Sequence, residues 1–126
     1  MSVSSERGKI GEAHVREYLS SNGWDILSAN YRIRGGEIDI IAKKDNIITF
    51  VEVKTRKYNS LDNGLDAVDR KKRTFIVRAA QRYIEETACT FTELRFDVAV
   101  VSITTESAPR VLKMKYYENA FDAFDI

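Results

Sequence analysis

The sequence predicts an α/β fold, a mixed β-sheet flanked by helices in the order αβββαββ. Apolar residues recur at helical spacing through residues 66–87, which predicts a long helix. Segments 37–42 and 47–56 are joined by a short polar stretch, a pattern typical of a hairpin. The nearly continuous apolar run 94–103 indicates a central strand. A hairpin, a crossover helix and further strands favour a mixed sheet with helices packed on its faces.

The other elements follow from terminal signals and shorter patterns. Asp66 and Asp69 can cap the long helix, because Asp side chains accept hydrogen bonds from the first helical N–H groups. Gly23 suits the end of a first helix, and Gly35-Gly36 marks a turn. These signals predict a first helix, two further strands and a short last helix, at residues 5–22, 24–31, 111–117 and 118–124.

Length and composition limit the class of protein. A chain of 126 residues is long enough for one core, so residues 1–126 are expected to form a single domain. No apolar run is long enough to cross a bilayer, and the first residues lack the apolar core of a secretory signal. Cys89 is the single cysteine, which excludes an internal disulfide and a Cys-rich zinc site. We therefore expect a cytoplasmic protein without a membrane span.

The net charge of +1 hides an uneven distribution. The segment from Arg32 to Arg82 holds 13 basic and 7 acidic residues, whereas the segment from Glu85 to Ile126 holds 4 basic and 8 acidic residues. A local basic face attracts polyanions such as nucleic acid, although ordinary solvated charge gives the same pattern. Charge alone favours the second interpretation.

The predicted hairpin carries the candidate chemistry. Side chains of a strand alternate between faces, so Glu37 and Asp39 are expected on one face, with Ile38 and Ile40 on the other. On the second strand, one face begins with apolar residues and ends with three charged ones, Glu52, Lys54 and Arg56. Charged side chains beside buried ones are costly unless they are paired, hydrated or bound to a metal.

The length of the hairpin loop decides whether the acids of the two strands meet. A two-residue loop places Asp39 opposite Glu52, and a four-residue loop places Glu37 there instead. Either even loop gathers three carboxylates and a lysine on one side of the sheet, whereas an odd loop separates Asp39 from Glu52.

Facing carboxylates repel each other, which favours a bound cation. Mg²⁺ prefers one or two carboxylates and keeps several waters, a coordination suited to phosphate chemistry. The competing interpretation is a surface sheet with Glu52–Lys54 and Asp39–Arg56 ion pairs.

Short motifs spread over nearly the whole chain form a recognisable set. They are GEIDII at 36–41, FVEVKTR at 50–56, GKIGEA at 8–13, NYR at 30–32, Lys72, RFDV at 95–98 and NAF at 119–121. This set resembles the YraN family of predicted endonucleases, which is similar to archaeal Holliday-junction resolvases and belongs with the PD-(D/E)XK nucleases. The resemblance implies a restriction-endonuclease-like fold. Ile38 stands in place of the Pro in the superfamily's name, a common replacement there.

The resemblance implies a role for each matching residue. Asp39 and Glu52 would bind a metal ion, helped by the Val53 carbonyl, and Lys54 would be the catalytic lysine. Such a lysine holds or helps deprotonate the attacking water and offsets charge on the phosphate. Glu12 would reach the site from the first helix as an additional acid; otherwise it is a solvated residue or pairs with the arginine four residues later. The implied cofactor is Mg²⁺, for which Mn²⁺ can substitute.

These observations predict a metal-dependent nuclease that hydrolyses phosphodiester bonds in DNA, with branched or damaged DNA as candidate substrates. Arg56, Lys71, Arg78 and Arg82 are candidate phosphate contacts, and the last three recur at helical spacing, as a solvated helix face also does. A non-catalytic nucleic-acid-binding module and a protein-interaction domain are the competing functions. Paired cuts would require a symmetric homodimer. Asp97, within the central strand, is expected to form a buried pair with an Arg or a Lys.

Overall fold

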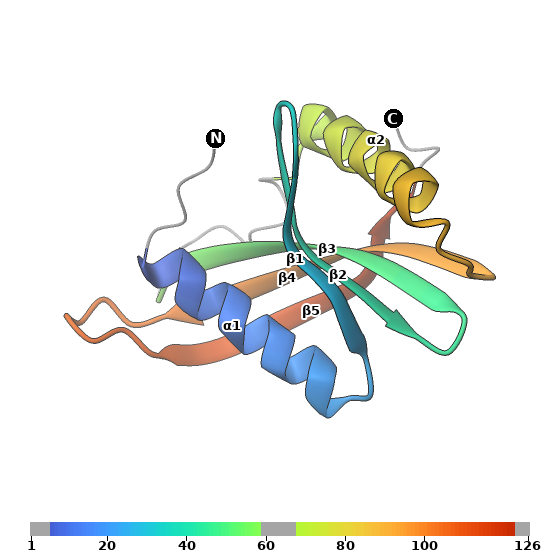
Figure 1. Ribbon diagram of the computed structural model, residues 1–126. Coiled ribbons are helices and arrows are strands. Elements are labelled where there is room, and N and C mark those ends of the chain that lie inside the picture. Colours follow the sequence, from blue (N-terminus) through green and yellow to red (C-terminus); the bar gives the residue numbers. More distant parts are fainter. Residues whose placement is uncertain (1–5, 59–67, 123–126) are drawn as a thin grey trace.

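The computed structural model describes residues 6–58 and 68–122 (Figure 1). Within these ranges the helices and strands follow the predicted order. Their bounds are α1 Glu6–Ser21, β1 Asp25–Ile33, β2 Gly36–Lys44, β3 Ile47–Lys57, α2 Arg70–Thr87, β4 Glu93–Ile103 and β5 Val111–Phe121. Neither helix in the described ranges is long and apolar enough to cross a bilayer.

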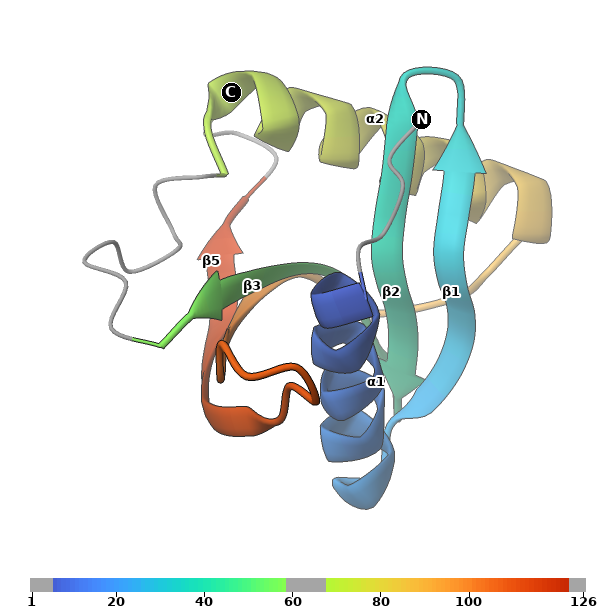
Figure 2. The same cartoon turned by 90° about the vertical axis from the view of Figure 1, so that its left-hand side faces the viewer.

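The strands form one sheet in the order β1-β2-β3-β4-β5. Neighbouring strands are antiparallel except β3 and β4, which are parallel and are connected by the segment that contains α2. Figures 1 and 2 show α1 and α2 on opposite sides of this sheet. The fold is the predicted mixed α/β arrangement, and it agrees with a restriction-endonuclease-like architecture.

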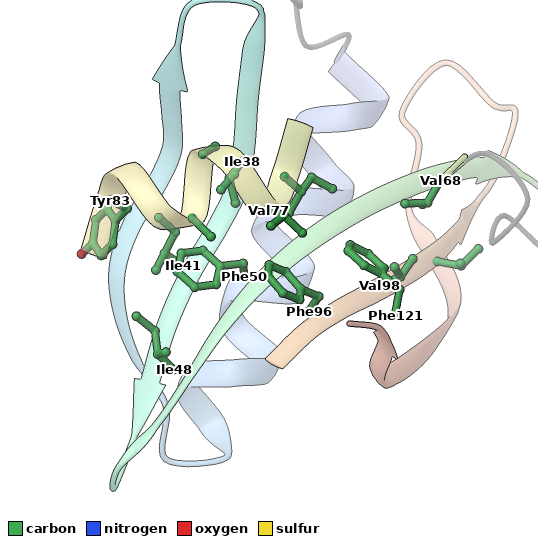
Figure 3. Packing of buried hydrophobic residues seen from close by; sticks show 14 residues of the cluster. Ile38, Ile41, Ile48, Phe50, Val68, Val77, Tyr83, Phe96, Val98 and Phe121 are labelled. Atoms are coloured by element: carbon green, nitrogen blue, oxygen red, sulfur yellow. The ribbon is translucent and has the colours of Figure 1, made fainter. Parts of the chain in front are cut away.

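Each helix covers its own apolar core. On the α2 side, Phe50 of β3 packs against Phe96 of β4 and Tyr83 of the helix, surrounded by aliphatic residues (Figure 3). On the α1 side, Val15 and Leu19 of the helix are buried with aliphatic residues of the sheet. The central strands therefore have apolar residues on both faces, as the continuous apolar run 94–103 predicted.

The long helix begins later than its apolar pattern predicted. It starts at Arg70 because Asp69 caps it: Asp69 Oδ1 accepts a hydrogen bond from the backbone N–H of Lys72 at 2.9 Å. Asp66, the other candidate cap, lies outside the described residues.

The prediction of a short last helix is wrong over its described part, because β5 continues to Phe121. The register between β4 and β5 shifts between Phe96 and Val98, where β5 accommodates extra residues. Asp97 holds this bulge, since its Oδ1 accepts a hydrogen bond from the Asn119 N–H at 2.8 Å and Asn119 has a φ of 51°. A contact to another strand thus overrides the local pattern. The end of the predicted helix lies outside the described residues.

Candidate metal site

Strands β2 and β3 pair over only part of their length. Their register ends at the Ile40–Val51 pair, and beyond this point β2 pairs with β1 whereas β3 pairs with β4. Figures 1 and 2 show the two strands turning away from each other. Asp39 and Glu52 are the next residues after the last pair, so they lie where the sheet forks. We call this branch point the fork.

The fork brings two carboxylates and a main-chain oxygen together. The hairpin register is that of a two-residue loop at Asp45-Asn46, which puts Asp39 and Glu52 at opposing positions. Instead of a further ladder bond, Asp39 Oδ2 accepts a hydrogen bond from the Val53 N–H at 2.8 Å. The N–H and C=O of a strand residue point to the same edge. The Val53 carbonyl is therefore directed toward the fork.

The expected alternation of faces along β2 is interrupted at Asp39. Ile38 lies in the core on the α2 side (Figure 3), whereas Ile40 lies in the core on the α1 side, so the prediction that they share a face is wrong. The cause lies on β1, where Asn30 has a φ of 58° and the ladder skips the position opposite Asp39. Asn tolerates this left-handed conformation better than most residues. The irregularity places Asp39 between the diverging strands.

The Asp39 and Glu52 carboxylates form a buried, hydrogen-bonded pair, and the two residues are only 7% and 5% exposed. Burial raises the pKa of Asp39, and the hydrogen bond and negative charge of Glu52 raise this pKa further, to about 10. The pair therefore holds a proton near neutral pH. Burial of both residues contradicts the surface sheet of the alternative interpretation, although the Glu52–Lys54 ion pair of that alternative is present.

Two lysines from different elements reach Glu52. Lys54 of β3 places its Nζ 3.8 Å from Glu52 Oε2, on the predicted face. Lys72, in the first turn of α2, is closer, with its Nζ 3.0 Å from the same oxygen. Burial lowers the pKa of Lys72, but Glu52 and, to a smaller extent, Asp39 and Glu37 outweigh burial, and the net pKa is raised. Lys72 is not among the predicted site residues, although it belongs to the motif set that resembles the YraN family and lies in the first turn of a capped helix.

The predicted third carboxylate does not join this pair. Glu37 instead forms an ion pair with Arg32 of β1, at 3.0 Å from Nε to Oε2. Among the described residues, no three His, Cys, Asp or Glu side chains form a group that could hold a metal ion. Two carboxylates and a carbonyl still fit Mg²⁺, which binds through one or two carboxylates and retains waters. Glu52 Oε2 is also buried, and the groups that face it are the ammonium groups of Lys72 and Lys54, so this oxygen is placed to accept a cation.

Glu12 reaches the fork from α1. This helix approaches β3 closely because residue 11 is glycine, and a Cβ at that position would collide with the Thr55 side chain. Glu12 is largely buried and accepts a hydrogen bond from Asn30 Nδ2 at 3.0 Å. Its charge also contributes to the raised pKa of Asp39. Glu12 is thus not the solvated helix residue of the alternative interpretation.

The candidate phosphate contacts differ in their surroundings. Lys71 and Arg78 are exposed on α2, whereas Arg56 of β3 is partly buried. Arg82 is exposed, but its Nε donates a hydrogen bond to Glu86 at 2.6 Å, so part of its charge is offset. Lys71 lies in the first helical turn and Arg82 about three turns further along. These four residues therefore do not form one uniform basic patch.

Asp97 forms hydrogen bonds within the sheet and is not part of the fork. It is fully buried, and its Oδ2 accepts hydrogen bonds from Arg95 Nη2 at 2.9 Å and from the Tyr116 hydroxyl at 2.7 Å. The predicted buried pair with a basic residue is therefore confirmed. Burial and the neighbouring Asp97 charge raise the pKa of Tyr116, so the hydroxyl remains a donor. The network joins β4 to β5.

Comparison with known proteins places the chain in a family. The model of a family described as "Uncharacterised protein family UPF0102" matches residues 11–101. A protein of Dictyoglomus turgidum is 40% identical over 118 residues, which cover 94% of this chain and 98% of the relative. A protein of Alkaliphilus metalliredigens is 40% identical over 119 residues, which cover 94% of this chain and all of the relative. The chain belongs to family UPF0102.

Both UPF0102 relatives are named "UPF0102 protein", a name that states no activity. The region matched by the family model includes Glu12, both carboxylates of the fork, Lys54 and Lys72. The candidate site therefore lies within the part of the chain that defines the family.

Proposed function

We propose that this protein is a divalent-metal-dependent nuclease that hydrolyses phosphodiester bonds in DNA. The observation that carries the proposal is the buried Asp39–Glu52 pair at the fork, with Lys54 beside it. Two buried carboxylates that share one proton suit a divalent cation, because the cation can replace the proton and neutralise both groups. The resemblance to the YraN endonucleases supports the same reaction.

The residues of the fork would contribute in different ways. Asp39, Glu52 and the Val53 carbonyl would hold Mg²⁺ or Mn²⁺. When bound, such an ion lowers the pKa of a water and offsets charge on the phosphate. Lys54 would orient the attacking water and stabilise negative charge that develops on the phosphate. Glu12 would act as an additional acid next to Asp39.

DNA is the proposed substrate because exposed or partly exposed cations border the fork. Lys71 lies in the first turn of α2 and Arg56 follows Lys54 along β3, so both are available to phosphates that approach the carboxylates. The similarity of the YraN family to junction resolvases favours branched or damaged DNA. The protein would act in the cytoplasm, and paired cuts would require a homodimer.

The test is cleavage of linear, nicked, flapped and four-way DNA by the purified protein with Mg²⁺ or Mn²⁺. We expect cleavage of at least one substrate and a loss of roughly 100-fold or more in Asp39→Asn, Glu52→Gln and Lys54→Met. Two controls make the same charge changes at exposed positions, Glu85→Gln on α2 and Lys113→Met on β5, and should cleave like the parent. DNA binding without cleavage would indicate a non-catalytic binding module. Absence of both would favour a protein-interaction domain.

A further inference from the structure

Lys72 holds the same Glu52 oxygen that a metal ion would need. Its Nζ lies 3.0 Å from Glu52 Oε2, whereas the Nζ of Lys54 lies 3.8 Å from that oxygen. The fold sets this contact, because Asp69 accepts a hydrogen bond from the Lys72 N–H and fixes the first turn of α2. The nearest cation to Glu52 in the described structure therefore comes from the helix and not from β3.

An ammonium group and a divalent cation compete for Glu52. Mg²⁺ binds carboxylate oxygens at about 2.0–2.1 Å, so a bound ion and an ammonium 3.0 Å from the same oxygen would be only about 5 Å apart at most. Like charges repel strongly at that separation in a buried site. Without either cation, however, the buried Glu52 carboxylate would keep only the more distant Lys54 ammonium, 3.8 Å away, as a countercharge, which is also costly.

We propose that Lys72 is an exchangeable counter-ion, which neutralises Glu52 until a divalent cation binds and then turns outward to solvent. This inference rests on the proposed metal site. Its side chain is suited to the exchange, because 35% of the Lys72 side chain is exposed compared with 22% for Lys54 and 4% for Glu52. The lysine stem is flexible, so the ammonium can leave the carboxylate without moving the helix.

A fixed structural ion pair would behave differently from an exchangeable counter-ion. If Lys72 only supported the fold, its removal would lower stability and leave metal affinity unchanged or weakened. An exchangeable counter-ion makes the opposite prediction for the metal, because its removal abolishes a competitor. Metal affinity measured without DNA therefore separates the two cases.

The experiment is calorimetric titration of Mn²⁺ and Mg²⁺ into Lys72→Met, a variant that loses the ammonium and keeps much of the stem. We expect metal affinity to rise about tenfold or more, because one repelling charge near the ion is gone. The thermal midpoint without metal should fall, because Glu52 loses its nearest countercharge. Lys113→Met is the matched control: it removes the same charge from an exposed position on β5 and should leave both quantities close to those of the parent.

An affinity in Lys72→Met equal to or below that of Lys113→Met would overturn the inference. If Lys72→Met does not fold without metal, Lys72→Gln, which keeps a polar group beside Glu52, serves in its place with the same expectation. Failure of the proposed function looks different, because then neither the parent nor Lys113→Met would bind Mg²⁺ or Mn²⁺.

Discussion

The carboxylate of Asp39 accepts a hydrogen bond from the backbone N–H of Val53 at 2.8 Å and so ties β2 to β3 where the strands diverge. Asp39 thus has a structural function in addition to its proposed function as a metal ligand. The two functions can be separated, because Asn keeps an acceptor for the Val53 N–H and resembles the neutral, protonated form of Asp39.

Substitutions at Asp39 should differ in their effect on folding. Asp39→Ala leaves the Val53 N–H without its acceptor, so we expect a loss of about 1–3 kcal/mol in the free energy of unfolding without metal. Asp39→Asn should lose clearly less. Urea unfolding of both variants measures the difference, and equal stabilities would show that the bond to Val53 contributes little.

Metal binding should stabilise the parent protein. At a metal concentration about 100 times the dissociation constant, binding to the folded state adds about 2.7 kcal/mol, which raises the thermal midpoint. This rise should disappear in Asp39→Asn and Glu52→Gln and persist in Lys54→Met, which keeps both carboxylates. Thermal melts with Mg²⁺, with Mn²⁺ and with a chelator check the prediction, and Glu85→Gln controls for the loss of an acid elsewhere. A thermal midpoint of the parent protein that does not change with either metal would contradict this prediction.

The stability of the metal-free protein should depend on pH through Asp39. Burial and Glu52 raise its pKa from 3.8 to about 10, so the folded protein binds this proton more tightly than the unfolded chain does. The resulting stabilisation is complete at low pH and is lost as the pH rises from about 4 toward 10. Asp39→Asn lacks this proton, so its stability relative to the parent should improve between about pH 6 and pH 9. A stability difference that is constant over this range would refute the raised pKa.

DNA binding should weaken as salt increases, because phosphates that contact lysine and arginine release counterions. Replacing Lys71 or Arg78 by Ala should reduce the slope of log affinity against log salt by about 1 each. Arg82→Ala should reduce the slope less, because Glu86 already offsets its charge. Fluorescence anisotropy with labelled DNA at several salt concentrations measures these slopes, and Lys113→Ala on β5 should leave the slope unchanged.

The Asp97 network should be essential for stability and not for metal binding. Asp97→Ala leaves Arg95, whose side chain is 12% exposed, without its buried partner, so we expect a loss of about 3–5 kcal/mol. Tyr116→Phe removes one hydrogen bond and should cost about 1 kcal/mol. Denaturant unfolding measures both changes. Metal titration of Tyr116→Phe should match the parent, and a changed affinity would show that this network is coupled to the fork.

The sequence by itself determined the element order and the two-sided burial of the central strands, and it made the meeting of Asp39 with Glu52 depend on an even loop length. The first two features depend on local periodicity, which can be read without knowledge of distant contacts, whereas the loop length could not be read in this way. Once the loop at Asp45-Asn46 holds two residues, the pairing of the next residues along both strands is fixed. The same local logic predicted that Asp97 would need a basic partner.

Only the tertiary structure decided which charges reach the fork. The left-handed Asn30 on β1 interrupts β2 and separates Ile38 from Ile40, and strand periodicity cannot report such a kink. Glu37, the predicted third carboxylate, forms an ion pair with Arg32 and does not join Asp39 and Glu52. Lys72 comes from a helix 20 residues beyond Glu52 in the sequence, and its contact with that acid depends on how α2 crosses the sheet. Long-range packing sets these contacts, because residues far apart in the chain meet only after the helices and the sheet have assembled.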